Sequence, residues 1–177
     1  MKKPNSKADK SAKPNPARNI CIVAPHLIDH GPLHETAGAM TGLARVLSAA
    51  GNRVTLLFVP EFNTVDDGGI NFLKDYFYDN HLVELEVLLE ARDLLPSLTY
   101  PQKKSVAVYY YLKDKGFDGV YFALEGGLSY YSLIAADTGM FAERPEIAVV
   151  AQSPLMWLGE ADRFFLRNVD ELSVHHQ

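Results

Sequence analysis

The stretch that decides the fold runs from residue 20 to residue 60: ICIVAPHLIDHGPLHETAGAMTGLARVLSAAGNRVTLLFVP. It begins and ends with short apolar runs, residues 20–24 and 53–59, rich in branched side chains, and each predicts a buried strand. From about Glu35 the apolar residues recur with helical spacing, and Gly51 stands where a helix would end. The two strands do not alternate between apolar and polar residues, which is typical of parallel strands covered on both faces. The stretch therefore predicts a βαβ unit.

The alternation of strands and helices continues along the chain. The further predicted elements are a short helix at 70–78, a more exposed strand at 81–88, a helix from Pro101 to Gly116, a strand at 118–124, a helix at 127–139 and a strand at 147–153. This order predicts an α/β protein, a Rossmann-like three-layer domain with a mostly parallel sheet.

Polar or glycine-containing segments follow four of the predicted strands. They are PHLIDHGPLHE (25–35), PEFN (60–63), EGG (125–127) and QSP (152–154). Ligands of open α/β sheets bind beyond the carboxyl ends of the strands. We therefore expect these segments to converge on one cleft.

Composition limits the class of protein. The chain has 177 residues, 47% of them hydrophobic, which is enough for one folded domain with a core. Its single cysteine, Cys21, excludes an internal disulfide, fits a reducing compartment, and lies in an apolar run that predicts a buried, inert thiol. No stretch approaches the roughly 18–20 apolar residues of a membrane span, so no transmembrane segment is predicted.

Charge divides the chain into two parts. Residues 1–19 hold six basic residues and one acid, with Pro, Ser and Asn between them, and predict a disordered basic tail. The formal net charge of the whole chain is −5, so the predicted domain at 20–177 is clearly acidic. An acidic body argues against general nucleic-acid binding, which requires a basic surface.

Three stretches together resemble a known family. They are GLARVLSAAGNRVTLLFVP (42–60), LKDKGFDGVYFALEGGLSYYSLIAADTG (112–139) and IAVVAQSPLMWLGE (147–160). In order and spacing, over roughly residues 20–165, the chain is similar to the N-terminal domain of a GT-B fold retaining glycosyltransferase of the family 4 type, which is a glycogen-synthase-like domain.

The resemblance implies transfer of a sugar from a nucleotide-sugar donor to the hydroxyl of a glycan or other acceptor, with retention of configuration. In this family the N-terminal domain mainly holds the acceptor, a C-terminal domain holds the nucleotide, and the fold usually works without a metal or other cofactor. The sequence ends at Gln177, before such a C-terminal GT-B domain. We therefore expect an acceptor-side half that is inactive alone, either a fragment or one subunit of a split enzyme. The expected location is cytoplasmic, with peripheral association at the inner membrane left open.

The resemblance also implies which loops face the donor and the acceptor, although it assigns no catalytic residue. The family's first-loop glycine pair falls here on His34 and Glu35, and its later histidine falls on Gln152. The loop residues that we expect to face the ligands are Asp29, His30, Gly31, His34, Glu35, Glu125, Gly126, Gly127, Gln152 and Ser153.

Two alternatives remain at this stage. The segment APHLIDH faintly resembles the opening of zinc-dependent deacetylases of N-acetyl amino sugars, in which His26 and Asp29 would bind zinc, although Ile28 stands at the position of the catalytic base. HETAG is not an HExxH motif, because Gly38 and Ala39 stand where the second histidine would be needed. The other alternative is a non-catalytic binding or assembly domain of a split glycosyltransferase.

Overall fold

The structure is a computed structural model that describes residues 16–27, 35–60, 67–89 and 97–151. Its elements are β1 (Asn19–Ala24), α1 (Glu35–Ala49), β2 (Arg53–Phe58), α2 (Asp67–His81), β3 (Val83–Val87), α3 (Tyr100–Leu112), β4 (Gly119–Ala123), a 3₁₀ turn (Glu125–Gly127), α4 (Tyr130–Asp137) and β5 (Glu146–Val150). The strands form one sheet in the order β3-β2-β1-β4-β5, and every neighbouring pair is parallel. The predicted Rossmann-like α/β class is confirmed.

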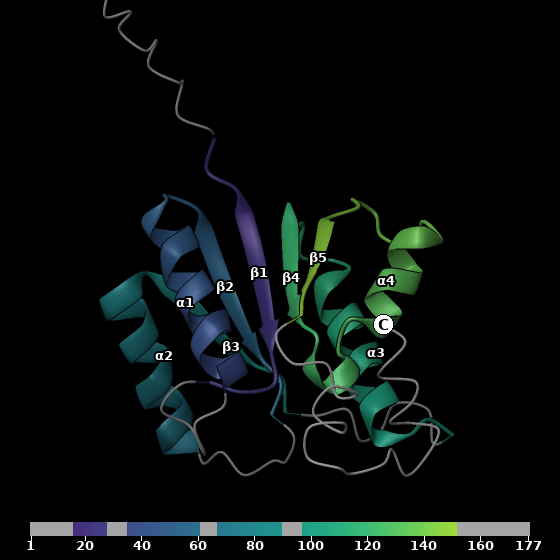
Figure 1. Ribbon diagram of the computed structural model, residues 1–177, viewed down its shortest axis with the longest axis horizontal. Coiled ribbons are helices and arrows are strands. Elements are labelled where there is room, and N and C mark those ends of the chain that lie inside the picture. Colours follow the sequence, from purple (N-terminus) through teal and green to yellow (C-terminus); the bar gives the residue numbers. More distant parts are fainter. Residues whose placement is uncertain (1–15, 28–34, 61–66, 90–96, 152–177) are drawn as a thin grey trace, which may run out of the picture.

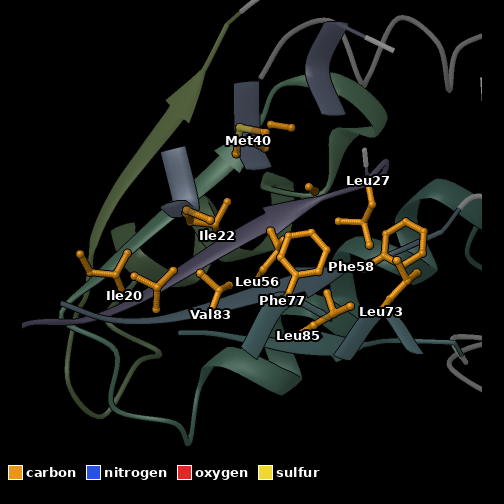
Figure 2. Packing of buried hydrophobic residues seen from close by; sticks show 14 residues of the cluster. Ile20, Ile22, Leu27, Met40, Leu56, Phe58, Leu73, Phe77, Val83 and Leu85 are labelled. Carbon is orange, nitrogen blue, oxygen red and sulfur yellow. The ribbon is translucent and has the colours of Figure 1, made fainter. Parts of the chain in front are cut away.

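Helices cover both faces of the sheet, as the apolar runs require (Figure 1). Helices α1 and α2 pack on one face, where Ile22 and Leu56 of the central strands contact Met40 of α1 and Phe77 of α2 (Figure 2). Helices α3 and α4 pack on the other face. Because side chains alternate along a strand, the intervening residues of β1 and β4 point into this second core.

Cys21 lies in the second core. Its side chain is fully buried, and burial raises the pKa of the thiol well above its usual value. The expectation of a buried cysteine is confirmed.

The edge strand β3 follows the predicted alternation. Val83 and Leu85 are buried under α2, whereas Glu84 between them is exposed. One helix differs from the prediction: in place of a continuous helix at 127–139, a 3₁₀ turn precedes α4, which begins at Tyr130. The cause is the backbone of Gly126 and Gly127, whose φ angles of 78° and 63° are left-handed and cannot continue an α-helix.

Among the described residues, no helix has both the length and the apolar character needed to cross a membrane.

Candidate functional site

The candidate site lies where β1 and β4 end side by side. These strands pair over Ile20–Val23 and Gly119–Phe122 but are about a hundred residues apart in sequence. From β1 the chain continues to α1 on one face of the sheet, and from β4 it continues to α4 on the other face. Such divergence opens a crevice at the carboxyl edge, which is where open α/β sheets bind ligands.

A tight turn closes the end of β4. The Leu124 N–H donates to the Val150 carbonyl (3.2 Å), after which Glu125, Gly126 and Gly127 form the 3₁₀ turn. A Cβ added to Gly126 would lie 3.8 Å from Leu128 Cγ and 3.9 Å from Pro25 Cβ. The turn therefore rests against the residue that follows β1.

Glu125 also contacts the segment after β1 through its side chain. Its Oε1 lies 3.4 Å from His26 Nε2, and the two side chains are 37% and 16% exposed. The contact is an ion pair when the histidine is protonated. It joins the ends of β1 and β4 across the switch in strand order, and both groups remain accessible from solvent.

A pocket of about 200 Å³ lies beside this pair. It is lined by Pro25, Val59, Tyr100, Pro101, Lys104, Gly126 and Leu128. Thus the ends of β1, β2 and β4 and the first turns of α3 all contribute to it. The sequence prediction that the strand ends converge is confirmed for the described parts of these three ends.

Lys104 provides the charge in the pocket wall. Its side chain lies on the inner side of α3 and the residue is only 9% exposed. The ammonium donates a 2.6 Å hydrogen bond to the Pro60 carbonyl after β2, and it lies 4.7 Å from the centre of the Tyr100 ring. A carbonyl dipole and a ring face both favour a cation, so this lysine is held in place.

The start of α3 and the start of α4 are tied together behind the pocket. Ser105 Oγ donates to the Leu128 carbonyl (3.1 Å) and accepts from the Tyr131 N–H (3.0 Å). At the beginning of α3, the Thr99 N–H donates to Gln102 Oε1 at 3.0 Å, and Pro101 occupies a first-turn position that has no N–H to satisfy. These bonds hold Lys104 and Leu128 on opposite walls.

The structure brings together only part of the predicted set of site residues. Glu125 and Gly126 lie at the pocket, and Gly127 is buried in the same turn. Glu35 is the first residue of α1, and only its backbone is described. The remaining predicted site residues lie outside the described residues: Asp29, His30, Gly31, His34, Gln152 and Ser153.

Sequence reasoning missed Tyr100 and Lys104. One signal for the lysine was present: residues 104, 108 and 112 lie four apart, and Val108 and Leu112 belong to the core. A lysine on the buried stripe of a helix is rare and marks a position with a special environment.

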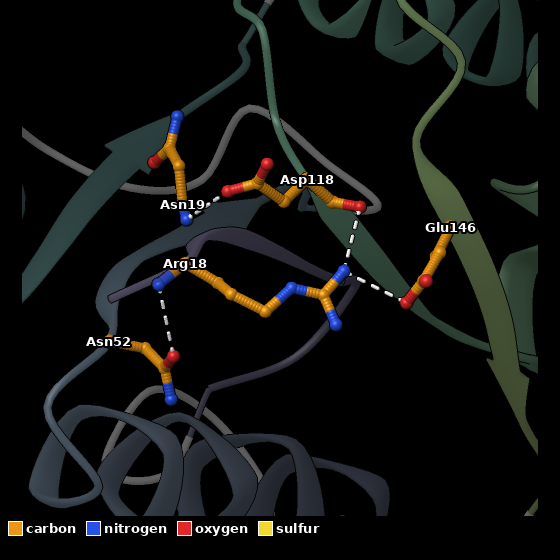
Figure 3. Close-up of polar contacts among 5 residues, drawn as sticks. All are labelled: Arg18, Asn19, Asn52, Asp118 and Glu146. Carbon is orange, nitrogen blue, oxygen red and sulfur yellow. Dashed lines mark hydrogen bonds and ion pairs between the residues drawn. The ribbon is translucent and has the colours of Figure 1, made fainter. Parts of the chain in front are cut away.

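The amino edge of the sheet also carries polar groups, but they bind one another (Figure 3). Arg18 Nη2 donates to Glu146 Oε2 (2.8 Å) and to the Asp118 carbonyl (3.1 Å). The Asn19 N–H donates to Asp118 Oδ2 at 2.7 Å. These bonds join the starts of β1, β4 and β5.

A second pocket, of about 150 Å³, lies towards this amino edge on the α3 face. Acidic and basic side chains both line it, and Arg53 lies 3.9 Å from Glu84 within it. Tyr111, also in its wall, has a pKa raised above its usual value, mainly by burial. The mixture of charges gives this pocket no preference for ligands of one sign.

No group of three or more His, Cys, Asp or Glu side chains able to hold a metal occurs among the described residues. His26, a candidate zinc ligand from the sequence, contacts Glu125 through Nε2. Asp29, the other candidate ligand, lies outside the described residues.

Comparison with known proteins identifies no family. No protein-family model matches the chain, and no curated protein matches it. Among solved structures, the chain is similar to the C-terminal domain of a hydrogenase from Pyrococcus furiosus, with 14% sequence identity and a TM-score of 0.43, over 80% of this chain and 100% of that one. A likeness at this level carries no functional argument.

Proposed function

We propose that the chain is the N-terminal, acceptor-side domain of a retaining GT-B glycosyltransferase, and that its pocket at the carboxyl edge holds the hydroxyl acceptor. The observation that carries this proposal is the position of the pocket. It lies where β1 and β4 diverge, at the place where the fold binds ligands, and three strand ends line it.

The side chains around the pocket suit a molecule rich in hydroxyl groups. The Tyr100 ring is 45% exposed and offers an aromatic face to the apolar side of a sugar ring. Glu125 and His26 offer hydrogen-bonding groups at the rim, where a carboxylate accepts a bond from a hydroxyl. A few placed polar groups in a mainly apolar pocket are typical of small-molecule sites.

In the proposed reaction the acceptor hydroxyl attacks the anomeric carbon of a nucleotide sugar, and the bond from that carbon to the diphosphate breaks. This domain would contribute by fixing the position of the hydroxyl. Stabilisation of the departing diphosphate charge would come from the second domain of the GT-B fold, together with recognition of the nucleotide.

A binding experiment tests the assignment of the acceptor side. The chain is titrated with mono- and disaccharides and with nucleotide sugars, followed by backbone amide NMR. We expect saccharides to shift the amides of Gly126 and Leu128, and Glu125→Gln to weaken that binding, whereas nucleotide sugars leave the same amides unchanged. Asp114→Asn, an exposed change at the far end of α3, serves as the control. Binding of nucleotide sugars in place of saccharides would overturn the proposal.

The two alternatives predict different results. A zinc deacetylase would purify with about one zinc per chain and release acetate from N-acetyl amino sugars. An assembly domain would bind a separate donor-binding chain and show no saccharide binding at the amides of the pocket. Metal analysis and acetate release, measured on the same preparation as the titration, separate these outcomes.

A further inference from the structure

We propose that the ligand of the carboxyl-edge pocket is anionic, and that Lys104 binds its phosphate or carboxylate group. This inference rests on the proposed function and narrows it: the acceptor is a small molecule, or the end of a larger one, that carries a negative charge beside its hydroxyl groups.

The first argument is the burial of the charge. Lys104 is the one charged residue in the buried set of the residues that the structure describes; the other polar members are Thr41, Thr55, Ser105, Ser129 and Ser132. Removing an ammonium from water costs several kcal/mol in free energy even after the protein relaxes. A methionine of similar length would fill the same space on the inner side of α3 without that cost. The lysine is thus a costly choice at this position unless its charge is used.

The second argument is that the ammonium is held in place. The Pro60 carbonyl accepts one hydrogen bond at 2.6 Å, and the Tyr100 ring lies 4.7 Å away. A lysine on the surface loses side-chain entropy when it binds an anion. Here the structure has already met most of that loss, and a fixed cation in a partly enclosed site attracts an anion more strongly than a cation in open solvent.

The third argument is the shape of the space that the ammonium faces. Lys104 separates two pockets. The one towards Leu88 and Ala107 has a volume of about 10 Å³, roughly enough for a single water molecule. The other is the 200 Å³ pocket at the strand ends. That volume is below the range of roughly 300–1,000 Å³ typical of drug-sized ligands, so it fits a small group or one ring of a longer molecule.

The fourth argument is the character of the remaining walls. Apart from Lys104 and the Tyr100 ring, the pocket is lined by Pro25, Val59, Pro101, Gly126 and Leu128. No carboxylate belongs to this lining among the described residues, and Glu125 lies at the rim facing His26. The amino-edge pocket differs, because Glu84 and Glu86 line it together with Lys115. The carboxyl-edge pocket therefore combines one cation with an apolar and aromatic surface.

The test compares charged and neutral probes on the intact chain. Inorganic phosphate, a hexose phosphate, a hexuronate and a neutral hexose are titrated into the protein by calorimetry and amide NMR. We expect the hexose phosphate and the hexuronate to bind about tenfold or more tightly than the neutral hexose, since a charge-assisted hydrogen bond is worth that much. Lys104→Met should remove the difference.

Lys103→Met is the matched control, because it removes the same charge from the neighbouring residue of α3 and leaves Lys104 intact. We expect it to keep the preference for anions. Equal binding of neutral and charged hexoses, or an equal loss in both variants, overturns the inference. If Lys104→Met does not fold, the wild-type titration decides: phosphate should shift the amides of Tyr100, Gly126 and Leu128, and absence of those shifts overturns the inference.

The design distinguishes failure of the inference from failure of the proposed function. If neutral saccharides bind at the pocket with no preference for charge, the acceptor role stands and the anionic ligand is wrong. If phosphate binds in a Lys104-dependent manner but none of the saccharides does, the anion site stands and the acceptor role is wrong. A lipid-linked phosphate is separated from a soluble one by adding vesicles that contain a phosphorylated lipid.

Discussion

The two edges of the sheet use polar residues in opposite ways. At the amino edge, Arg18, Asn19, Asp118 and Glu146 bond to one another and join the starts of three strands. At the carboxyl edge, His26 and Glu125 contact each other at the rim of a pocket whose wall holds the buried Lys104. One edge connects the strands to each other, whereas the other leaves room for a ligand.

Backbone conformation shows the same difference. β4 begins with Gly119, which lies in a regular strand, and is followed by Gly126, whose φ is 78°. The unusual conformation thus occurs at the edge where the pocket lies. Strained or special backbone positions cluster at functional sites, because a ligand requires a close and exact approach. The contrast teaches that the site is built by the segments after the strands, not by the strands.

The largest expected effect in stability is at Gly126. Gly126→Ala should lower the free energy of unfolding by about 1–2 kcal/mol, because a left-handed φ is costly for a residue with a Cβ. The added Cβ would make ordinary contacts of 3.8–3.9 Å, so the cost comes from the backbone and not from a clash. Urea unfolding measures it.

Gly119→Ala, at the other end of β4, is the matched control. Its Cβ would also meet its nearest neighbours at ordinary distances (3.7–3.9 Å), and its φ is not left-handed. We expect a change within about 0.5 kcal/mol. Equal losses for the two variants would show that the backbone at Gly126 is not special.

The next effect is at the amino edge. Asp118→Ala removes the acceptor of the Asn19 N–H, a bond of 2.7 Å, and should cost about 1 kcal/mol. Asp114→Ala removes an exposed carboxylate whose nearest cation, Lys113, is 3.8 Å away, and should change stability little. If the two variants are equally stable, the amino-edge network does not hold the strands together.

Prediction from sequence was most complete for the elements that show one pattern. The runs at 20–24 and 53–59 lie within β1 and β2 to one residue at their ends, because parallel strands buried on both faces are continuously apolar. The edge strand β3 was equally clear, because its exposed Glu84 alternates with buried valine and leucine. In each case local periodicity reports the environment directly.

The candidate site was only half predictable for the same physical reason. Glu125 and Gly126 follow a strand, so the rule for carboxyl ends identifies them. Tyr100 and Lys104 lie on a helix that reaches the pocket only because the chain crosses from β3 over to β4. The contact between His26 and Glu125 joins residues 99 positions apart. No local pattern encodes such juxtapositions.

A smaller effect is expected for the exposed ion pair of the amino edge. Glu146→Gln breaks the pair with Arg18 but should leave the urea midpoint unchanged within error, since the two side chains are 80% and 40% exposed. Glu146 also raises the pKa of Arg18, which has no consequence for stability because the guanidinium is charged at every accessible pH. A clear loss of stability would show that this edge depends on the pair.

The smallest effect is a pH dependence at His81, at the end of α2 near the start of β3. Its ring packs edge-on against Tyr76 and Phe77, and its Nε2 has no hydrogen-bond partner among the described residues. Burial, and then the nearby Arg45, lower the pKa of His81 below its usual 6.5. The unfolded chain therefore binds the proton more readily than the folded one. The contribution of His81 is then complete above about pH 6.5 and falls as the pH is lowered through that value. The drop in urea midpoint between pH 7.5 and 5.5 should be slightly smaller in His81→Gln than in the wild type, and a larger drop in the variant would show that the folded state favours the charged ring.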